Sequence, residues 1–222
     1  MNQALECLKV ELETFGENYD AKMAERDRRM FNITRDTGEF LAVLVRATVA
    51  KKVLEIGTSN GYSTLWLAEA TQAIGGSVTT VELAQNKADL ARANFERSGL
   101  SCITLMQMDA TLLLEQSTTS GYDLVFLDSE RSEYAHWWPQ LRRVLRPGGL
   151  AGRGQRHLAR SRIGSADGCC EVRSRVHDLP RSHRQRGVSC GKVDVVDPMD
   201  VAWGSCPKLS LKCRHRRLFF VC

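Results

Sequence analysis

The sequence has 222 residues, enough for one domain with a sizeable core and hardly enough for two. Its 43% hydrophobic and 26% charged residues are ordinary for a globular protein and argue against wholesale disorder. No apolar run reaches the roughly 18 residues of a membrane helix, and the polar N-terminus lacks the basic-then-apolar order of a signal peptide. We therefore expect a soluble, cytoplasmic protein with no membrane partner.

The net charge of +5 combines two unlike segments. Residues 1–149 hold 16 basic and 20 acidic side chains, a net charge of −4, whereas residues 150–222 hold 15 and 6, a net charge of +9. Six of the eight cysteines also follow residue 149. We divide the chain into N-terminal helices (1–50), a core (51–149) and an atypical basic, cysteine-rich tail (150–222) that we expect to be poorly ordered.

Apolar spacing predicts two helices before residue 50, the second capped by Asp36 or Thr37. Short apolar runs then alternate with helical stretches. Strands are predicted over 51–57, 76–83, 101–110 and 122–129, and helices over 62–72, 84–99, 110–116 and 133–149. These four strand–helix units indicate an α/β fold, a Rossmann-like, doubly wound, mainly parallel sheet with helices on both faces.

The pattern breaks after Gly149, where a fifth buried strand should follow. Residues 150–168 contain several arginines and no apolar run, and a helix-covered sheet cannot bury those charges without partners. Strands five to seven are therefore in doubt. Their loss would expose the edge of the fourth strand, which predicts low stability and aggregation.

The loop after the first predicted strand reads G-T-S-N-G over residues 57–61. Gly57 and Gly61 permit a sharp turn and a close approach to a ligand, and the following helix directs its first amides at negative groups. Four acids are expected at this one sheet edge: Glu55, Glu82, Asp109 and Asp128. Glu82, 25 residues after Gly57, is placed to accept hydrogen bonds from a ribose diol. The edge suits a cationic, adenosine-bearing cofactor, because the carboxylates would repel a pyrophosphate.

Two other enzyme classes fit this loop less well. An NAD-binding fingerprint would have a glycine where Ser59 stands. The loop also matches the G-x-S-x-G elbow of hydrolases, but the only histidine in the well-patterned region is His136, beside two tryptophans in a predicted helix. A solvated strand end is the alternative for any single acid, and helix N-capping is an equal alternative for Asp109.

The segments VLEIGTSNGYSTLWLA, TTVEL, YDLVFLDSERSEY and LRPGG resemble, in order and spacing, the class I S-adenosylmethionine-dependent O-methyltransferases related to catechol and caffeoyl-CoA O-methyltransferase. The resemblance covers roughly residues 25–149. It implies methyl transfer from S-adenosylmethionine to a hydroxyl of a small, aromatic acceptor. Metal-dependent members use Mg²⁺ or another divalent cation, and the resemblance makes a homodimer a reasonable expectation.

The resemblance also assigns expected roles by matching positions. The implied cofactor-binding residues are Glu55, Gly57, Ser59, Gly61, Ser63, Glu82, Asp109 and Asp128. Ser63 would bind the cofactor carboxylate, Glu82 the ribose and Asp109 the adenine. Asp128 would also be a metal ligand, and it is a catalytic candidate together with Arg131, which stands where the family has a lysine base. Because the pKa of arginine exceeds about 12, catalysis would need another base or rely on positioning alone.

The sequence departs from the family after R-P-G-G. The family continues with a strand ending in Asp-Asn, which supplies two more metal ligands, whereas residues 152–157 read G-R-G-Q-R-H. The same codons read from their second base permit Val-Val-Asp-Asn-Ala-Thr, so we hypothesise that the chain from about residue 151 is translated in a shifted frame. Sequencing the gene tests this, and stop codons in the other frame would refute it.

Three classes of function follow from these observations. The first is an active O-methyltransferase, and the second is an impaired or pseudo-methyltransferase that keeps part of the cofactor site but has lost the C-terminal strands and the metal site. The third, a nucleic-acid-binding protein, is disfavoured because the arginines of the tail are scattered and form no recognisable module. A zinc site in the tail is disfavoured because it has no C-x-x-C pair.

Overall fold

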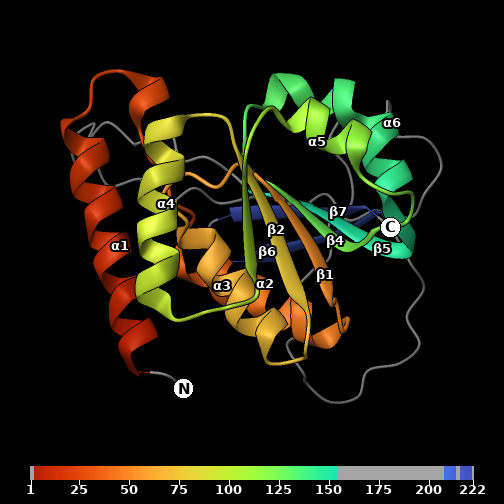
Figure 1. Ribbon diagram of the computed structural model, residues 1–222, viewed down its shortest axis with the longest axis horizontal. Coiled ribbons are helices and arrows are strands. Elements are labelled where there is room, and N and C mark those ends of the chain that lie inside the picture. The colour runs from red at the N-terminus through yellow and green to blue at the C-terminus, as the bar shows by residue number, and fades with distance from the viewer. Residues whose placement is uncertain (1–2, 155–207, 214–215, 222) are drawn as a thin grey trace, which may run out of the picture.

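The computed structural model describes residues 3–154, 208–213 and 216–221 of the chain. These residues form an α/β structure in which one sheet lies between two groups of helices (Figure 1). In chain order the elements are α1 (Gln3–Lys22), η1 (Arg26–Arg28), α2 (Arg35–Ala47), β1 (Lys52–Ile56), α3 (Tyr62–Gln72), β2 (Ser77–Glu82), α4 (Gln85–Ser98), β3 (Ile103–Gln107), α5 (Ala110–Gln116), β4 (Tyr122–Leu127), η2 (Arg131–Glu133), α6 (Tyr134–Val144), β5 (Leu145–Arg153), β6 (Lys208–Cys213) and β7 (Arg216–Val221).

The described strands form a seven-stranded sheet in the order β3-β2-β1-β4-β5-β7-β6. The five strands from β3 to β5 run parallel to their neighbours, and β7 runs antiparallel to both β5 and β6. The predicted Rossmann-like fold with a mainly parallel sheet is thus confirmed. Strand order reverses between β1 and β4, so their carboxyl ends flank the position where ligands of open α/β sheets bind.

The first four strands and their helices lie where the sequence predicts them, with α3 and α5 matching their predicted bounds. Gly99 ends α4 in the left-handed conformation, as expected for a C-cap glycine. The second helix begins two or three residues earlier than expected. Its N-cap is Thr34, whose backbone is extended, so the two predicted caps, Asp36 and Thr37, lie inside the helix.

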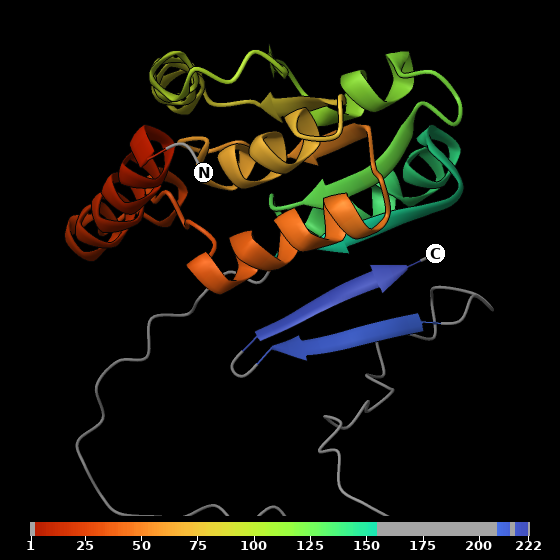
Figure 2. The ribbon, with the colours of Figure 1, turned by 90° about the horizontal axis from the view of Figure 1, so that it is seen from below.

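β5 corrects the prediction for the end of the core. The helix expected over 133–149 ends at Val144, and the chain continues as a strand that pairs with β4. Leu145 pairs with Tyr122, the register then shifts, and residues 150–153 pair with residues 124–127. Because of this shift, Pro147 and the two glycines after it have no regular pairing partner in β4. The expected loss of strands five to seven is therefore wrong, since β5 covers the edge of β4 and β7 covers part of β5 (Figure 2).

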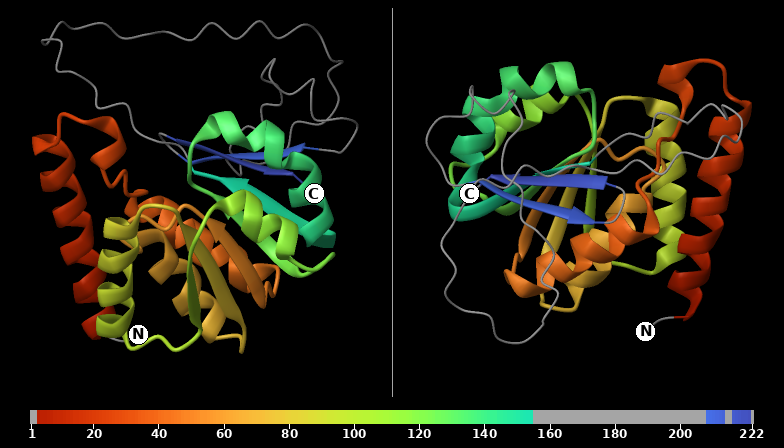
Figure 3. Two further views of the ribbon diagram at one scale, coloured as in Figure 1. Left: turned by 45° about the horizontal axis from the view of Figure 1, so that its top comes forward. Right: turned by 180° about the vertical axis from the view of Figure 1, so that it is seen from behind.

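Each face of the sheet packs against its own helices. Val53, on one face, belongs to a buried cluster with residues of α1, α2, α3 and α4, whereas Leu54, on the other, belongs to a cluster with residues of α5 and α6. This alternation is the two-residue period of a strand that is buried on both faces. Figure 3 shows from two further sides how these helices cover the sheet. Within the described ranges, no helix combines the length and the apolar character needed to cross a membrane.

A buried lysine attaches α1 to α3. The side chain of Lys9 is 0% exposed, and its Nζ lies 2.6 Å from Glu69, 2.9 Å from Glu6 and 3.7 Å from the centroid of the Trp66 ring. Arg35, at the start of α2, bonds to Glu6 at 2.8 Å and joins the same cluster. Since removing one partner of a buried charge leaves the other uncompensated, this cluster fixes where α1 lies on the core.

Candidate functional site

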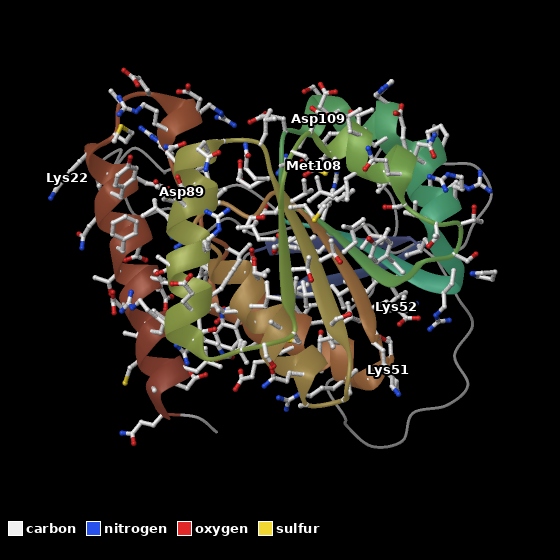
Figure 4. The ribbon with its side chains drawn as sticks, in the orientation of Figure 1. Lys22, Lys51, Lys52, Asp89, Met108 and Asp109 are labelled. Atoms are coloured by element: carbon white, nitrogen blue, oxygen red, sulfur yellow. The ribbon has the colours of Figure 1, made fainter. Side chains whose placement is uncertain are left out.

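The carboxyl ends of the parallel strands are held together by backbone hydrogen bonds that extend beyond the strands. The amide of Gly57 donates to Val81 at 3.0 Å, and that of Asp128 donates to Ile56 at 2.8 Å. The loops after β1, β2 and β4 therefore leave the sheet side by side. Figure 4 shows Asp109, which follows β3, at this same end. The expected convergence of the four strand ends is present in the fold.

Both glycines of the loop are required by the geometry. Gly57 has a φ of +98°, and a Cβ there would lie 2.6 Å from the carbonyl oxygen of Asp128. Gly61 has a φ of +87°, and a Cβ there would lie 2.5 Å from the Phe95 ring. Any side chain at either position would combine backbone strain with overlap. The two glycines therefore let the loop pack closely against Asp128 and Phe95.

The first turn of α3 presents amides to the loop. Its N-cap is Gly61, which has no side chain to satisfy them, and the amide of Tyr62 donates to Asn60 Oδ1 at 3.2 Å. The remaining first-turn amides, including that of Ser63, have no acceptor inside the helix and carry its positive end. Asn60 was not among the predicted residues. Its Nδ2 is buried without a partner in the described part of the chain, and its only signal in the sequence is its place between the two glycines.

Glu82, at the end of β2, faces this loop. Its Oε2 accepts the amide of Ser59 at 2.8 Å, and its Oε1 accepts the amide of Ala84 at 2.9 Å. A carboxylate oxygen can accept two hydrogen bonds, so each oxygen of Glu82 can accept one more. Two such positions on one carboxylate fit the two hydroxyl donors of a ribose. The structure thus places Ser59 beside Glu82, and contact of either residue with a ribose stays a prediction.

Glu55 lies beneath the loop and not on its surface. Its side chain is fully buried, and its Oε2 accepts hydrogen bonds from Thr64 and, at 2.7 Å, from Thr80. Oε1 has no partner among the described residues. Burial raises the pKa of Glu55 to about 7, although the nearby hydroxyls of Ser63, Thr64 and Thr80 oppose the shift. Glu55 therefore ties β1 to α3 and β2, a role that sequence alone does not distinguish from contact with a ligand.

Asp109 is the N-cap of α5. Its Oδ1 accepts the amide of Thr111 at 2.7 Å, which was one of two alternatives for this residue. Thr111 also accepts a hydrogen bond from Trp137 Nε1 at 3.0 Å, which joins α5 to α6. Capping occupies one oxygen of a half-buried carboxylate, so contact between Asp109 and a ligand stays a prediction.

Asp128 follows β4 and lies between the chain segments of Gly57 and Gly154. The amide of Gly154 donates to Leu127 at 2.9 Å, so the residue that follows β5 stands beside Asp128. A Cβ at Gly154 would overlap Asp128 Oδ1. No three His, Cys, Asp or Glu side chains within the described ranges are arranged to hold a metal ion. These residues therefore do not fit the divalent cation that the resemblance implies, because the neighbour of Asp128 is a glycine.

Arg131 lies on the surface at the start of η2, three residues after Asp128. The segment between them is tied to α6, since the amide of Ser129 donates to Tyr134 Oη at 3.1 Å and Tyr134 Oη donates to the Ser129 carbonyl at 3.0 Å. The hydroxyl of Ser129 is buried with no partner in the described residues. The predicted pair of catalytic candidates is thus close in sequence, with Asp128 at the sheet and Arg131 exposed.

The fold defines a Rossmann-like protein whose strand ends converge on a glycine loop. The O-methyltransferase family model matches residues 10–157, which is most of the described chain. The chain belongs to the O-methyltransferase family.

Named relatives agree with this assignment. The chain is 32% identical over 132 residues to a catechol O-methyltransferase of Niastella koreensis, covering 58% of this chain and 59% of the relative. It is 33% identical over 131 residues to a catechol O-methyltransferase of Mycobacterium tuberculosis, covering 53% and 59%. The crystal structure of an O-methyltransferase from Bacillus cereus in complex with SAH is 27% identical, with a TM-score of 0.56 over 69% of this chain and 66% of that one. The chain thus spans about three-fifths of the length of these curated relatives.

Proposed function

We propose that this chain binds S-adenosylmethionine at the carboxyl ends of β1 to β4 and transfers its methyl group to a hydroxyl of a small, aromatic acceptor. The observation that carries the proposal is the pairing of the glycine loop with Glu82, whose carboxylate is oriented by Ser59 and keeps two acceptor positions. The names of the catechol O-methyltransferase relatives and the SAH bound to the Bacillus cereus enzyme support it.

We assign each part of this cofactor to residues at the strand ends. The first-turn amides of α3, including that of Ser63, would hold its carboxylate, and Glu82 would accept from its ribose hydroxyls. Asp109 would lie near the adenine, and Asp128 would attract the ammonium group. When bound, S-adenosylmethionine supplies an electrophilic methyl group on a sulfonium. The surrounding carboxylates favour that positive charge, so the site should bind S-adenosylmethionine at least as tightly as the uncharged thioether product.

The described residues would support the reaction by positioning the reactants. The loop after β1 would hold the methyl donor still while an acceptor hydroxyl approaches in line, which lowers the entropic part of the barrier. Arg131 cannot act as a base, but its fixed positive charge after β4 favours the ionised form of a phenolic acceptor. We therefore expect acceptors with acidic hydroxyls, such as catechols, to react fastest.

Titration calorimetry with S-adenosylmethionine tests the binding half of the proposal. We expect stoichiometric binding to the wild type, and a loss of roughly 10- to 100-fold in affinity for Glu82→Gln, since hydrogen bonds to a charged group contribute about 1.5–3 kcal/mol each. Glu96→Gln is a matched control, because Glu96 is exposed on α4. No detectable binding to a folded wild type would refute the proposal.

A second candidate function is cofactor binding without methyl transfer, and the observation that favours it is Gly154 beside Asp128. The two candidates differ in an assay of methyl transfer to catechol, with Mg²⁺ and with a chelator. Transfer at a rate proportional to enzyme supports the methyltransferase. Tight binding with no transfer under either condition supports the second candidate.

The cellular setting of the chain is also a prediction. We propose a cytoplasmic homodimer that acts on a small molecule without a nucleic-acid or membrane partner. Sedimentation of the purified chain tests the dimer. A retardation assay with DNA and RNA at several salt concentrations tests the expectation that the chain has no nucleic-acid partner. Binding that weakens steeply with salt would contradict it.

A further inference from the structure

The segment that joins α1 to α2 is anchored to α1, to α4 and to the loop after β1. Residues 23–31, which we call the strap, contain η1. The carboxylate of Asp20, at the end of α1, accepts the amides of Met30 at 2.7 Å and of Phe31 at 2.9 Å. Met30 is only 3% exposed, so its end of the strap is packed into the molecule.

A second anchor comes from α4. Lys87 Nζ donates to two strap carbonyls, that of Asp27 at 3.0 Å and that of Arg29 at 2.8 Å. The guanidinium of Arg26 lies 5.4 Å from the Phe31 ring centroid, which holds the strap against itself. The strap therefore bridges α1 and α4, and α4 begins three residues after Glu82.

Ser59 joins the strap to the cofactor loop. Its hydroxyl donates to the Met30 carbonyl at 2.8 Å, while its amide donates to Glu82 Oε2 at 2.8 Å. One residue thus contacts both the strap and the carboxylate proposed to bind ribose. Because both its amide and its hydroxyl are hydrogen-bonded, Ser59 can adopt few backbone conformations without breaking one of these two hydrogen bonds.

Backbone strain is concentrated at this junction. Among the described residues, non-glycine residues with a positive φ are Phe31, Val49, Ser59 and Ser120. Phe31 and Ser59, both at a φ of 51°, lie on the two sides of the strap–loop contact. Left-handed conformations of such residues persist only where their surroundings enforce them. Here the hydrogen bonds to Asp20 and Glu82 do so.

We propose that Ser59 is a positioning residue that couples the strap to Glu82, so that cofactor binding and closure of the strap stabilise each other. This inference rests on the proposed function. A ligand that fixes Glu82 also fixes the Ser59 amide, and the Ser59 hydroxyl then holds Met30. By linkage, a closed strap must raise the affinity for the ligand by the same factor by which the ligand favours closure.

Trypsin provides the readout for strap opening. Arg26 and Arg28 are exposed in the strap, and cleavage after them needs the strap to leave its anchors. Arg92 is exposed in the middle of α4, so cleavage there needs the helix to unfold. The ratio of the two cleavage rates, measured by mass spectrometry of the peptides, separates opening of the strap from unfolding of the whole chain.

The probe is SAH, and the variants are Ser59→Ala, Ser59→Gly and Ser120→Gly. In the wild type we expect saturating SAH to slow strap cleavage at least fivefold more than cleavage after Arg92. Ser59→Ala should lose this protection and bind SAH about 5–10-fold more weakly, because one hydrogen bond contributes about 1 kcal/mol. Ser59→Gly should behave the same way in both assays although it relieves the backbone strain, so its melting temperature should exceed that of Ser59→Ala while its SAH affinity does not. A residue with only a structural role would not separate these two effects.

Ser120→Gly is the matched control. Ser120 also has a positive φ, 55°, but it is exposed in the loop before β4, and its amide donates to the Arg143 carbonyl at 2.8 Å. It should gain stability with no change in SAH affinity or strap protection. Normal SAH binding to the wild type without strap protection, or full protection in Ser59→Ala, would overturn the coupling alone. No SAH binding to the wild type would overturn the proposed function and the coupling with it.

Discussion

Carboxylates at the two ends of the parallel sheet differ in how completely they are hydrogen-bonded. At the amino ends, both oxygens of Asp123 are engaged: Oδ2 accepts the amides of Lys51 and Lys52, each at 2.8 Å, and Oδ1 accepts from Arg146 Nε at 2.5 Å. Burial acts to raise the pKa of Asp123, but these hydrogen bonds and the charge of Arg146 outweigh it and lower the pKa. Figure 4 shows Lys51 and Lys52 at this end and Asp109 at the opposite one.

At the carboxyl ends, acids lack such complete partners. Glu55 is buried with one oxygen unpartnered among the described residues and with its pKa raised to about 7, and Glu82 keeps an acceptor position on each oxygen. Fully bonded acids stabilise a fold, whereas incompletely bonded ones cost stability and are kept where a ligand or a reaction needs them. The comparison gives Asp123 a structural role at the amino ends and supports the site that we propose at the carboxyl ends.

The largest effect that we expect comes from Gly57→Ala. The new Cβ would meet the Asp128 carbonyl oxygen in a left-handed backbone, so the carboxyl ends of β1 and β4 must separate. We expect a loss of about 3–5 kcal/mol in the free energy of unfolding and at least a 100-fold loss in cofactor affinity. Denaturant unfolding and calorimetry measure the two quantities.

Gly75→Ala is the control for backbone strain. Gly75 has a φ of +69°, but a Cβ there meets no atom within 4 Å. It should destabilise the chain by about 1–2 kcal/mol and leave cofactor affinity unchanged. Equal effects of the two variants on affinity would mean that the loop after β1 is not the binding site.

Glu55→Gln should stabilise the chain in a pH-dependent way. Because the folded state holds the Glu55 proton more tightly than the unfolded chain does, the wild type loses stability as the pH rises from 4.5 to about 7. Glutamine keeps the shape without the charge, so the variant should match the wild type near pH 4 and exceed it by up to about 3 kcal/mol above pH 8. Unfolding measured across this pH range checks the sign. A difference that does not change with pH would contradict it.

Asp123→Ala should act in the opposite direction. It removes the acceptor of two amides and of Arg146, so we expect a loss of about 2 kcal/mol near neutral pH without an effect on cofactor affinity. Since the pKa of Asp123 is lowered from 3.8 in the fold, this stabilisation is complete above that pH and is lost as the pH falls below it. The difference between variant and wild type should therefore shrink in acid. Weaker cofactor binding by this variant would break the contrast between the two ends of the sheet.

The smallest expected effect is that of divalent cations. Because Gly154 offers no ligand beside Asp128, Mg²⁺, Mn²⁺ and a chelator should change cofactor affinity by less than about twofold. Electron paramagnetic resonance of Mn²⁺ with the wild type should show no stoichiometric binding. One bound Mn²⁺ that Asp128→Asn releases would show that the metal site is present.

The parts of the site that the sequence predicts are those set by local pattern. Strand ends follow from apolar runs, so the positions of Gly57, Glu82 and Asp128 could be anticipated. The burial of Glu55 could not, because it depends on hydroxyls from α3 and β2 that only the packed fold brings to one carboxylate. The strap was missed for the same reason, since Met30 and Ser59 are far apart in sequence and meet only when α1 packs on the core.

The apolar pattern of the sequence does not predict β5, for a different reason. Only Leu150 and Ala151 are apolar among the residues that pair regularly with β4, and glycine and arginine complete the strand. Pairing with β4 on one side and with β7 on the other holds this short run as a strand. The hypothesis of a shifted reading frame stays a prediction, and the nucleotide sequence around codons 148–160 tests it.

The lysine enclosed between α1 and α3 gives the protein a built-in chemical reporter. An amine-reactive label needs an accessible Nζ, and Lys9 does not offer one while its side chain is 0% exposed between Glu6 and Glu69 over the Trp66 ring. Exposed amines such as Lys22 should be modified first, and Lys9 only after α1 detaches. The rate at which Lys9 is labelled would therefore time the release of the first helix in the intact chain, without any introduced probe.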